Sequence, residues 1–271
     1  MNRINKRFEN LRQQGRKALI PYVVLGDPAR DVTLPVMHAL VESGADIIEL
    51  GVPFSDPTAE GPVIQKAHER ALANGSSLRD ALALVKQFRA EDEETPVLLM
   101  GYANPIERMG YDNFIKAAVD AGVDGVLTVD LPPEEAEEFN QHLKEADLEN
   151  IFLLAPTSSD ERQKMVTGMA GGFIYYVSLK GVTGAGHLDV DSVQQHVDHI
   201  RTLTELPVCV GFGIKDGASA RAVAELSDGA VVGSVLVNRM ATLAESGETD
   251  PAIYAGAVSE LIAEMRSALD N

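Results

Sequence analysis

The feature that most constrains this chain is an alternation of short apolar runs with longer amphipathic segments, repeated along its whole length. Runs rich in Val, Ile, Leu or Tyr that close on Gly, Pro or Asp predict strands, and the amphipathic segments between them predict helices. Eight such strand–helix units follow one another. The predicted strands are 18–25, 46–52, 96–102, 125–130, 150–155, 172–178, 207–212 and 229–233.

Eight consecutive units favour a closed (β/α)8 TIM barrel, an α/β fold of parallel strands inside a ring of helices, over the alternative of an open doubly wound sheet. A length of 271 residues suits one such barrel, and no linker divides it, so we expect a single domain over residues 1–271. An extra N-terminal helix is predicted because Ile4, Phe8 and Leu11 fall at positions i, i+4 and i+7. This helix could close the bottom of the barrel.

Composition excludes several classes of function. The formal charge of −18, from 41 acidic and 23 basic residues, disfavours binding to nucleic acid or to an anionic membrane. We find no signal-like N-terminus and no run of the ~20 apolar residues that span a bilayer. The only cysteine, Cys209, lies in an apolar run, which predicts packing rather than catalysis and rules out an intramolecular disulfide. We expect a cytoplasmic protein without a metal site.

An acidic residue lies within the second predicted strand. Alternation places Ile48, Leu50 and Val52 on one face and Glu49 on the other, so in a barrel Glu49 points inward near the upper end of its strand. Burial among apolar groups would raise its pKa and let it carry a proton near neutrality. The alternative is a buried ion pair, but no basic residue occurs in any of the eight predicted strands.

A long loop follows this strand and carries two more acids, Asp56 and Glu60. The loop between strand and helix is longer than a plain connection needs, which suggests a function. Glu60 could return over the barrel mouth and form a two-carboxylate site with Glu49, in which different surroundings separate the two pKa values. Both acids could equally be solvated loop charges or helix caps.

Glycine-bearing loops follow predicted strands six, seven and eight, in 180–186, 211–214 and 233–234. TIM barrels often bind phosphate after strands seven and eight, where backbone N–H groups and a helix N-terminus contact the oxygens. Ser234 could add a hydroxyl donor. Each loop by itself could be an ordinary turn, and none matches a nucleotide-binding fingerprint.

Tyr22, Tyr102 and Tyr175 lie in predicted strands or at their ends. Aromatic side chains there usually pack in the core, but at a barrel mouth they could enclose a planar apolar substrate. The sequence pattern leaves both interpretations open.

Several runs together resemble the tryptophan synthase alpha family, in the same order and over essentially the whole chain. The runs are Ile48–Pro57, Gly61–Gln65, Gly101–Pro105, Gly181–Gly184 and Gly211–Ile214. The resemblance implies a TIM barrel that reversibly cleaves indole-3-glycerol phosphate to indole and glyceraldehyde 3-phosphate, as one step of L-tryptophan synthesis.

The resemblance also implies roles for individual residues. Glu49 would be the general acid that protonates the indole ring, and the carboxylate of Glu60 would stabilise positive charge on the indole nitrogen. The positions that match the indole pocket are Tyr22, Tyr102, Leu127 and Tyr175. Those that match the phosphate cradle are Gly184, Gly213, Gly233 and Ser234. Thr183 would belong to a loop that closes over the substrate.

The resemblance implies a partner as well. Asp56 and its loop would face a pyridoxal phosphate-containing beta subunit in an alpha2beta2 assembly, whereas the alpha chain would need no cofactor itself. One position departs from the family pattern, because Glu60 stands where the family usually has aspartate. An extra methylene moves the charge by roughly 1 Å, and misplacement on that scale can cost about 100-fold in rate.

Three other functions remain open at the level of the sequence. Other phosphate-binding barrels share the late glycine loops but lack the signature of the second strand. A stand-alone lyase would release indole without a beta partner. An inactive barrel could serve only to regulate a partner, although Glu49 and the phosphate loops argue against this.

Overall fold

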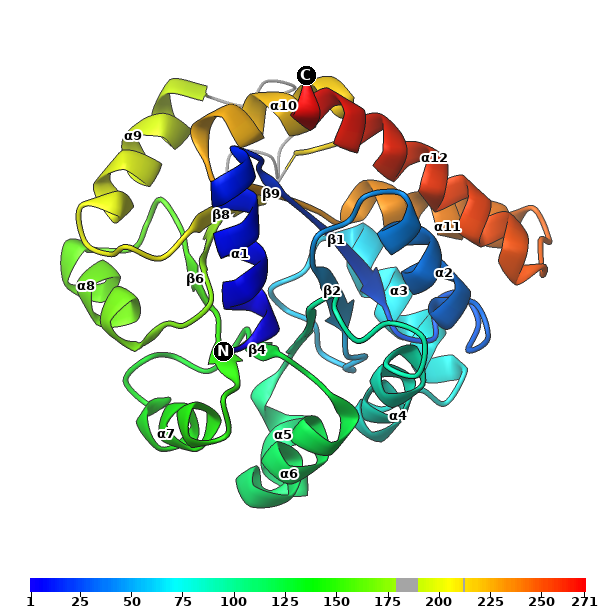
Figure 1. Ribbon diagram of the computed structural model, residues 1–271. Helices are drawn as coiled ribbons and strands as arrows, with labels where there is room; N and C mark the ends of the chain where they lie inside the picture. Colours follow the sequence, from blue (N-terminus) through cyan, green and yellow to red (C-terminus); the bar gives the residue numbers. More distant parts are fainter. Residues whose placement is uncertain (179–189, 212) are drawn as a thin grey trace.

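The computed structural model describes residues 1–178, 190–211 and 213–271, and these form a ring of parallel strands enclosed by helices (Figure 1). The strands are β1 Ala18–Val24, β2 Ile48–Gly51, β3 Val97–Gly101, β4 Gly125–Thr128, β5 Glu149–Asn150, β6 Phe152–Leu154, β7 Ile174–Val177, β8 Val208–Gly211 and β9 Gly229–Val232. The helices are α1 Arg3–Gln14, α2 Thr33–Glu42, α3 Pro62–Ala73, α4 Leu78–Phe88, α5 Ala103–Met109, α6 Tyr111–Ala121, α7 Glu137–Glu145, α8 Asp160–Met169, α9 Val190–Arg201, α10 Gly217–Leu226, α11 Ser234–Glu245 and α12 Pro251–Asp270.

The sheet closes on itself through one interrupted strand. Its order is β5-β4-β3-β2-β1-β9-β8-β7-β6, with parallel pairing throughout. β5 pairs with β4 and β6 pairs with β7, and only Ile151 separates these two short strands. The Ile151 N–H still donates to the carbonyl of Val126 at 2.9 Å. Residues 149–154 therefore act as a single barrel strand, and the eight-unit barrel predicted from the sequence is confirmed.

Side-chain alternation separates two cores, as predicted for β2. Ile48, Leu50 and Val52 pack in the large core between the strands and the helices. Ile47 belongs to a second core inside the ring. Because successive side chains of a strand point to opposite faces, Glu49 lies on the inner face with Ile47.

Helix α1 closes one end of the ring, and Figure 1 shows it lying across the strands. Its apolar stripe of Ile4, Phe8 and Leu11 is buried and packs into the inner core. Cys209 lies in this core and is fully buried, so its predicted packing role is confirmed. The strands begin at this end, and their carboxyl ends form the opposite mouth.

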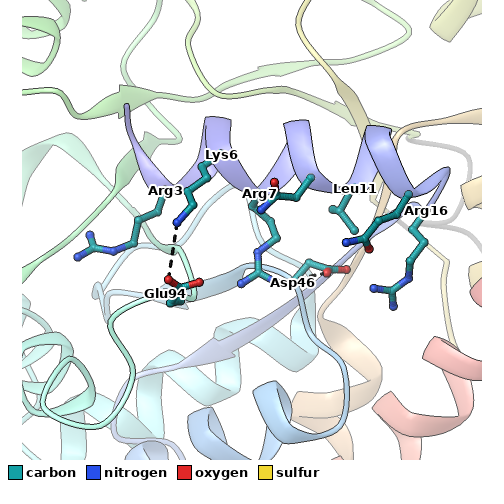
Figure 2. A pocket seen from close by; sticks show the side chains of 9 residues that line it. Arg3, Lys6, Arg7, Leu11, Arg16, Asp46 and Glu94 are labelled. Carbon is teal, nitrogen blue, oxygen red and sulfur yellow. Dashed lines mark ion pairs between the residues drawn. The ribbon is translucent and has the colours of Figure 1, made fainter.

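A hollow beside α1, at this closed end, is lined largely by charged side chains (Figure 2). Lys6 pairs with Glu94 at 3.6 Å, and Arg7 pairs with Asp46 at 3.8 Å. Arg16, also in the hollow, pairs with a carboxylate of α12 at 3.0 Å. Each of these cations already has an anionic partner, so the cluster fastens α1 to the barrel. Within the described ranges, no helix is long and apolar enough to cross a membrane.

Candidate active site

Glu49 lies at the mouth end of the inner face, in register between Tyr22 of β1 and Leu98 of β3. Its side chain is 2% exposed, and the Oε2 atom has no hydrogen-bond partner among the described residues. Burial, and then the charge of Glu60, raises the pKa of Glu49 to about 8. Near neutrality Glu49 therefore holds a proton, and one of its two oxygens has no partner among the described residues.

The second carboxylate is carried by the loop between β2 and α3. The ring of Phe54 stacks on that of Tyr102, with centroids 4.9 Å apart, and the Ala59 N–H donates to Tyr102 Oη at 3.2 Å. The Gln65 amide donates to the carbonyl of Glu60 at 2.9 Å. These contacts hold the loop over the end of β3. Glu60 is half-buried there, and burial raises its pKa to about 7.

Two tyrosines share this compartment with the carboxylates. Burial raises the pKa of Tyr22 and of Tyr175 well above 10, and the charges of Glu49 and Glu60 raise both further. The Tyr22 hydroxyl lies against Gly51, where any side chain would collide with it. The structure therefore brings together groups from β1, β2, β7 and the loop after β2.

Other inner-face residues complete the wall. Leu127 of β4 is 1% exposed and belongs to the closed inner core. Met100, Val129 and Leu153 also pack on this core but remain partly exposed. Sequence reasoning missed these three, although alternation along their strands would have placed them on the inner face.

The loops after β8 and β9 differ in how their helices begin. Helix α10 has a capping box in which Asp216 accepts from the Ser219 N–H at 2.8 Å. Helix α11 follows Gly233 and has no side-chain cap, and Ser234 is exposed at its first position. The free N–H groups and positive potential of α11 therefore suit an anion better than those of α10. Gly213 is exposed with a φ of +74°, which favours glycine.

The remaining predicted residues are Thr183, Gly184 and Asp56. Thr183 and Gly184 fall outside the described residues. Asp56 is exposed and accepts a hydrogen bond from the Ser55 hydroxyl at 2.6 Å. In the part of the chain that the structure describes, no cluster of three or more His, Cys, Asp or Glu side chains could hold a metal ion.

Sequence reasoning also missed His68 of α3, which is 2% exposed. Its ring contacts the Tyr22 hydroxyl at 3.2 Å and the Phe54 N–H at 3.0 Å. The available signal was its place on the apolar stripe of Ile64, Ala67 and Ala71, where a histidine is unusual.

The two carboxyl groups and the N-terminus of α11 lie at the same end of the barrel. A proton-holding carboxyl group lies beside a second carboxylate of lower pKa, and an uncapped helix N-terminus lies at the same mouth. The arrangement is that of a TIM-barrel enzyme, and it suits proton transfer on an anionic, partly apolar substrate.

The family model for the tryptophan synthase alpha chain matches residues 8–266, and the chain belongs to this family. Tryptophan synthase alpha chains of Thioalkalivibrio sulfidiphilus and Nitrosococcus oceani are 59% and 58% identical to it, and the matches cover 100% of this chain and 100% and 98% of theirs. The crystal structure of tryptophan synthase subunit alpha from Legionella pneumophila has a TM-score of 0.93 at 46% identity, covering 100% of this chain and 99% of that chain. The chain is accordingly a lyase of tryptophan biosynthesis.

Proposed function

We propose that this chain catalyses the alpha reaction by the reversible cleavage of indole-3-glycerol phosphate, with Glu49 as the proton donor. The observation that carries this assignment is the buried carboxyl group of Glu49, whose Oε2 has no hydrogen-bond partner among the described residues and whose pKa is raised to about 8. The reaction needs an acid that keeps its proton at neutral pH, and ordinary glutamic acid does not.

In the proposed cleavage, one proton is given to the substrate and one is taken from it. Glu49 gives its proton to the indole carbon that bears the side chain, which leaves positive charge on the ring nitrogen. The adjacent glycerol hydroxyl loses its proton, and the Glu49 carboxylate is the proposed acceptor. The carbon–carbon bond then breaks, its electrons neutralise the ring, and indole and an aldehyde result. Glu49 ends the cycle protonated, so no cofactor is required in this chain.

The negative charge of Glu60 would stabilise the ring nitrogen. Contacts of Phe54 and Ala59 with Tyr102 hold the loop that carries Glu60, and we propose that glutamate in place of the usual aspartate suits this position of the loop. We expect Glu60→Gln to abolish most activity and Glu60→Asp to lower it by about 10- to 100-fold, because the shorter side chain withdraws the charge. A large gain in Glu60→Asp would contradict this role.

We propose that the substrate lies across the mouth with its phosphate at the start of α11. Gly233 and Ser234 would bind the phosphate together with Gly213 and Gly184, and the uncapped N-terminus of α11 supports this. The indole ring would lie among Tyr22, Tyr102, Leu127 and Tyr175, with Thr183 on a closing loop.

We further propose a pyridoxal phosphate-containing beta subunit as partner, in an alpha2beta2 assembly within the cytoplasm. The exposed loop that carries Asp56 lies beside the mouth, which would suit direct transfer of indole. A tryptophan synthase from Mycobacterium tuberculosis, described as an aminoacrylate-bound form, matches this chain at 34% identity with a TM-score of 0.86 and covers 99% of it.

The test is release of indole from indole-3-glycerol phosphate by wild type and Glu49→Gln, each alone and with beta subunit. We expect Glu49→Gln to lose about 100- to 10,000-fold in rate. Glu149→Gln is the matched control, because that half-buried carboxyl group lies at the closed end and pairs with Asn5. Wild type that releases no indole under any condition would overturn the lyase assignment.

A further inference from the structure

The protonation state of His68 can be read from its two hydrogen bonds. The Phe54 N–H donates to Nδ1 at 3.0 Å, so Nδ1 carries no hydrogen. A neutral imidazole has one N–H, which must then be on Nε2. Nε2 therefore donates to Tyr22 Oη, 3.2 Å away.

The surroundings of His68 oppose its protonation. It packs in an apolar cluster with Ile64, Ala67 and Ala71 of its own helix, next to Tyr22 and Val237. This burial lowers the pKa of His68 to about 4. The imidazole thus remains neutral at physiological pH, and the direction of both hydrogen bonds is fixed.

A fixed His68 also fixes the Tyr22 hydroxyl. Because Tyr22 Oη accepts from Nε2, its own hydrogen must point elsewhere. No described residue accepts that hydrogen, Glu49 and Glu60 included. Among the described residues, Tyr22 is consequently a donor without an acceptor.

The position of the Tyr22 side chain indicates which part of a substrate it would contact. The base of its ring lies beside Gly233, where an added Cβ would come within 3.4 Å of Tyr22 Cδ1, and its hydroxyl lies against Gly51. The side chain thus spans from the start of α11 to the end of β2, the strand that carries Glu49. A substrate with phosphate at the first site and its reacting ring at the second must lay its connecting carbon chain along Tyr22.

We infer that His68 is a positioning residue that orients the Tyr22 hydroxyl as a hydrogen-bond donor to an oxygen of the substrate's three-carbon chain. By accepting from Phe54, the same ring ties this donor to the loop that carries Glu60. The inference rests on the proposed function and names a determinant of how that substrate is bound.

The experiment uses the reverse reaction, in which indole and glyceraldehyde 3-phosphate are separate substrates. Tyr22→Phe should raise KM for glyceraldehyde 3-phosphate by about tenfold, the worth of one hydrogen bond, whereas KM for indole should change much less, because phenylalanine keeps the ring that lines the indole pocket. Inhibition by inorganic phosphate, which has no carbon chain, should stay the same.

Two substitutions of His68 separate its two contacts. His68→Asn keeps an acceptor near Nδ1 but loses the donor to Tyr22, so it should reproduce the KM change of Tyr22→Phe. His68→Gln can place an amide N–H near Nε2 and should restore much of the affinity. The double variant Tyr22→Phe with His68→Asn should be no worse than Tyr22→Phe alone. His142→Asn, on the remote helix α7, is the control.

Several outcomes would overturn the inference. Additive effects of the two substitutions, or an equal rise in both KM values, would show only general damage to the site. If Tyr22→Phe shifted the pH profile of activity without changing KM, the Tyr22 hydroxyl would be a hydrogen-bond donor to a carboxylate and not to the substrate. Nitrogen NMR of the wild type gives an activity-independent test, because His68 protonated on Nδ1 at pH 7 would contradict the assignment. Failure of the proposed function would differ, since wild type would then form no product.

Discussion

Two requirements conflict at Glu49. Catalysis needs a carboxyl group that retains its proton, and the apolar barrel interior provides this by making the charged form unfavourable. The same burial makes Glu49 a cost to folding whenever it must ionise. A site residue that is poorly matched to its surroundings is therefore expected to weaken the folded state over part of the pH range.

The first prediction follows from the sign of that pKa shift. In the unfolded chain Glu49 ionises above about 4.5, whereas in the folded protein it stays protonated until about 8. Folded protein binds the extra proton in this window, so the stability contributed by Glu49 is present below 4.5 and lost as pH rises to 8. Glu49→Gln does not titrate and should gain on the order of several kcal/mol over wild type between pH 5 and 8.5. Thermal unfolding at both pH values tests this, and an unchanged difference in Tm would refute it.

The second prediction concerns the pH dependence of activity. Glu49 must be protonated, so kcat/KM should fall above about pH 8, and Glu60 must be ionised, so it should fall below about pH 7. The result is a narrow bell centred between these values. In Glu60→Gln the acid limb should disappear and the alkaline limb should move to lower pH, because the neighbouring charge that raises the pKa of Glu49 is gone. An alkaline limb that stays in place would mean that the two groups do not interact.

At the scale of residues, the sequence predicted an orientation that depends on a single strand. The period of two along β2 predicted that Glu49 faces inward, and β2 does place it there. The hydrogen bonds among Tyr22, Phe54 and His68 join a strand, a loop and a helix. No local pattern encodes such a meeting, because it depends on how α3 packs on β1.

Among the elements, α10 and α11 begin differently. The N-terminus of α10 is capped by side chains, whereas that of α11 has no side-chain cap and suits an anion. Within the chain, Glu264 accepts from the N–H of Gly217, the first residue of α10, and Asp216 accepts from the N–H of Ser219. Helix α11 lacks this arrangement and lies beyond the adjacent strand of the ring. The glycines that drew attention to both loops in the sequence could not distinguish the two.

The third prediction uses this contrast. Ser234→Asp adds a negative charge in the first turn of α11, which should favour the helix by about 0.3–1 kcal/mol but repel phosphate. We expect an unchanged or higher Tm together with a rise of at least tenfold in KM for indole-3-glycerol phosphate. Thr242→Asp puts the same charge near the far end of α11 and should leave KM unaltered. Equal KM values in both variants would remove α11 from the phosphate site.

Strand boundaries were predictable to within a few residues, and the interruption at Ile151 was not. The sequence predicts one strand over 150–155, whereas the structure divides 149–154 between β5 and β6. The break occurs where the chain changes partners from β4 to β7 to close the ring. Ring closure is a property of the whole sheet, so a local apolar run contains no sign of it.

For the whole molecule, the formal charge of −18 opposes the approach of an anionic substrate. The fourth prediction is that kcat/KM for indole-3-glycerol phosphate rises severalfold as salt increases from about 10 to 150 mM, since the screening length falls from roughly 30 to 8 Å. In the reverse reaction, KM for neutral indole should not respond to salt. A fall in kcat/KM with added salt would instead indicate that local positive potential dominates the encounter.

The closed ring also supports our proposal that residues 1–271 form one domain, because each strand depends on both of its neighbours. We expect one cooperative unfolding transition in denaturant, with far-ultraviolet and tyrosine signals changing together. Two separated transitions would contradict the proposal.

The helix that closes the barrel, α1, covers a thiol whose rate of chemical labelling can report on opening of the barrel. Cys209, the only thiol, is fully buried in the core under Phe8 and Leu11. Two ion pairs fasten the ends of this helical segment, Arg3 to Asp124 at 2.9 Å and Arg16 to Asp270 at 3.0 Å. A thiol reagent can therefore reach Cys209 only when the end of the barrel that α1 covers opens. Its rate of labelling would time the detachment of one helix in an otherwise folded barrel, and loosening either ion pair should quicken it.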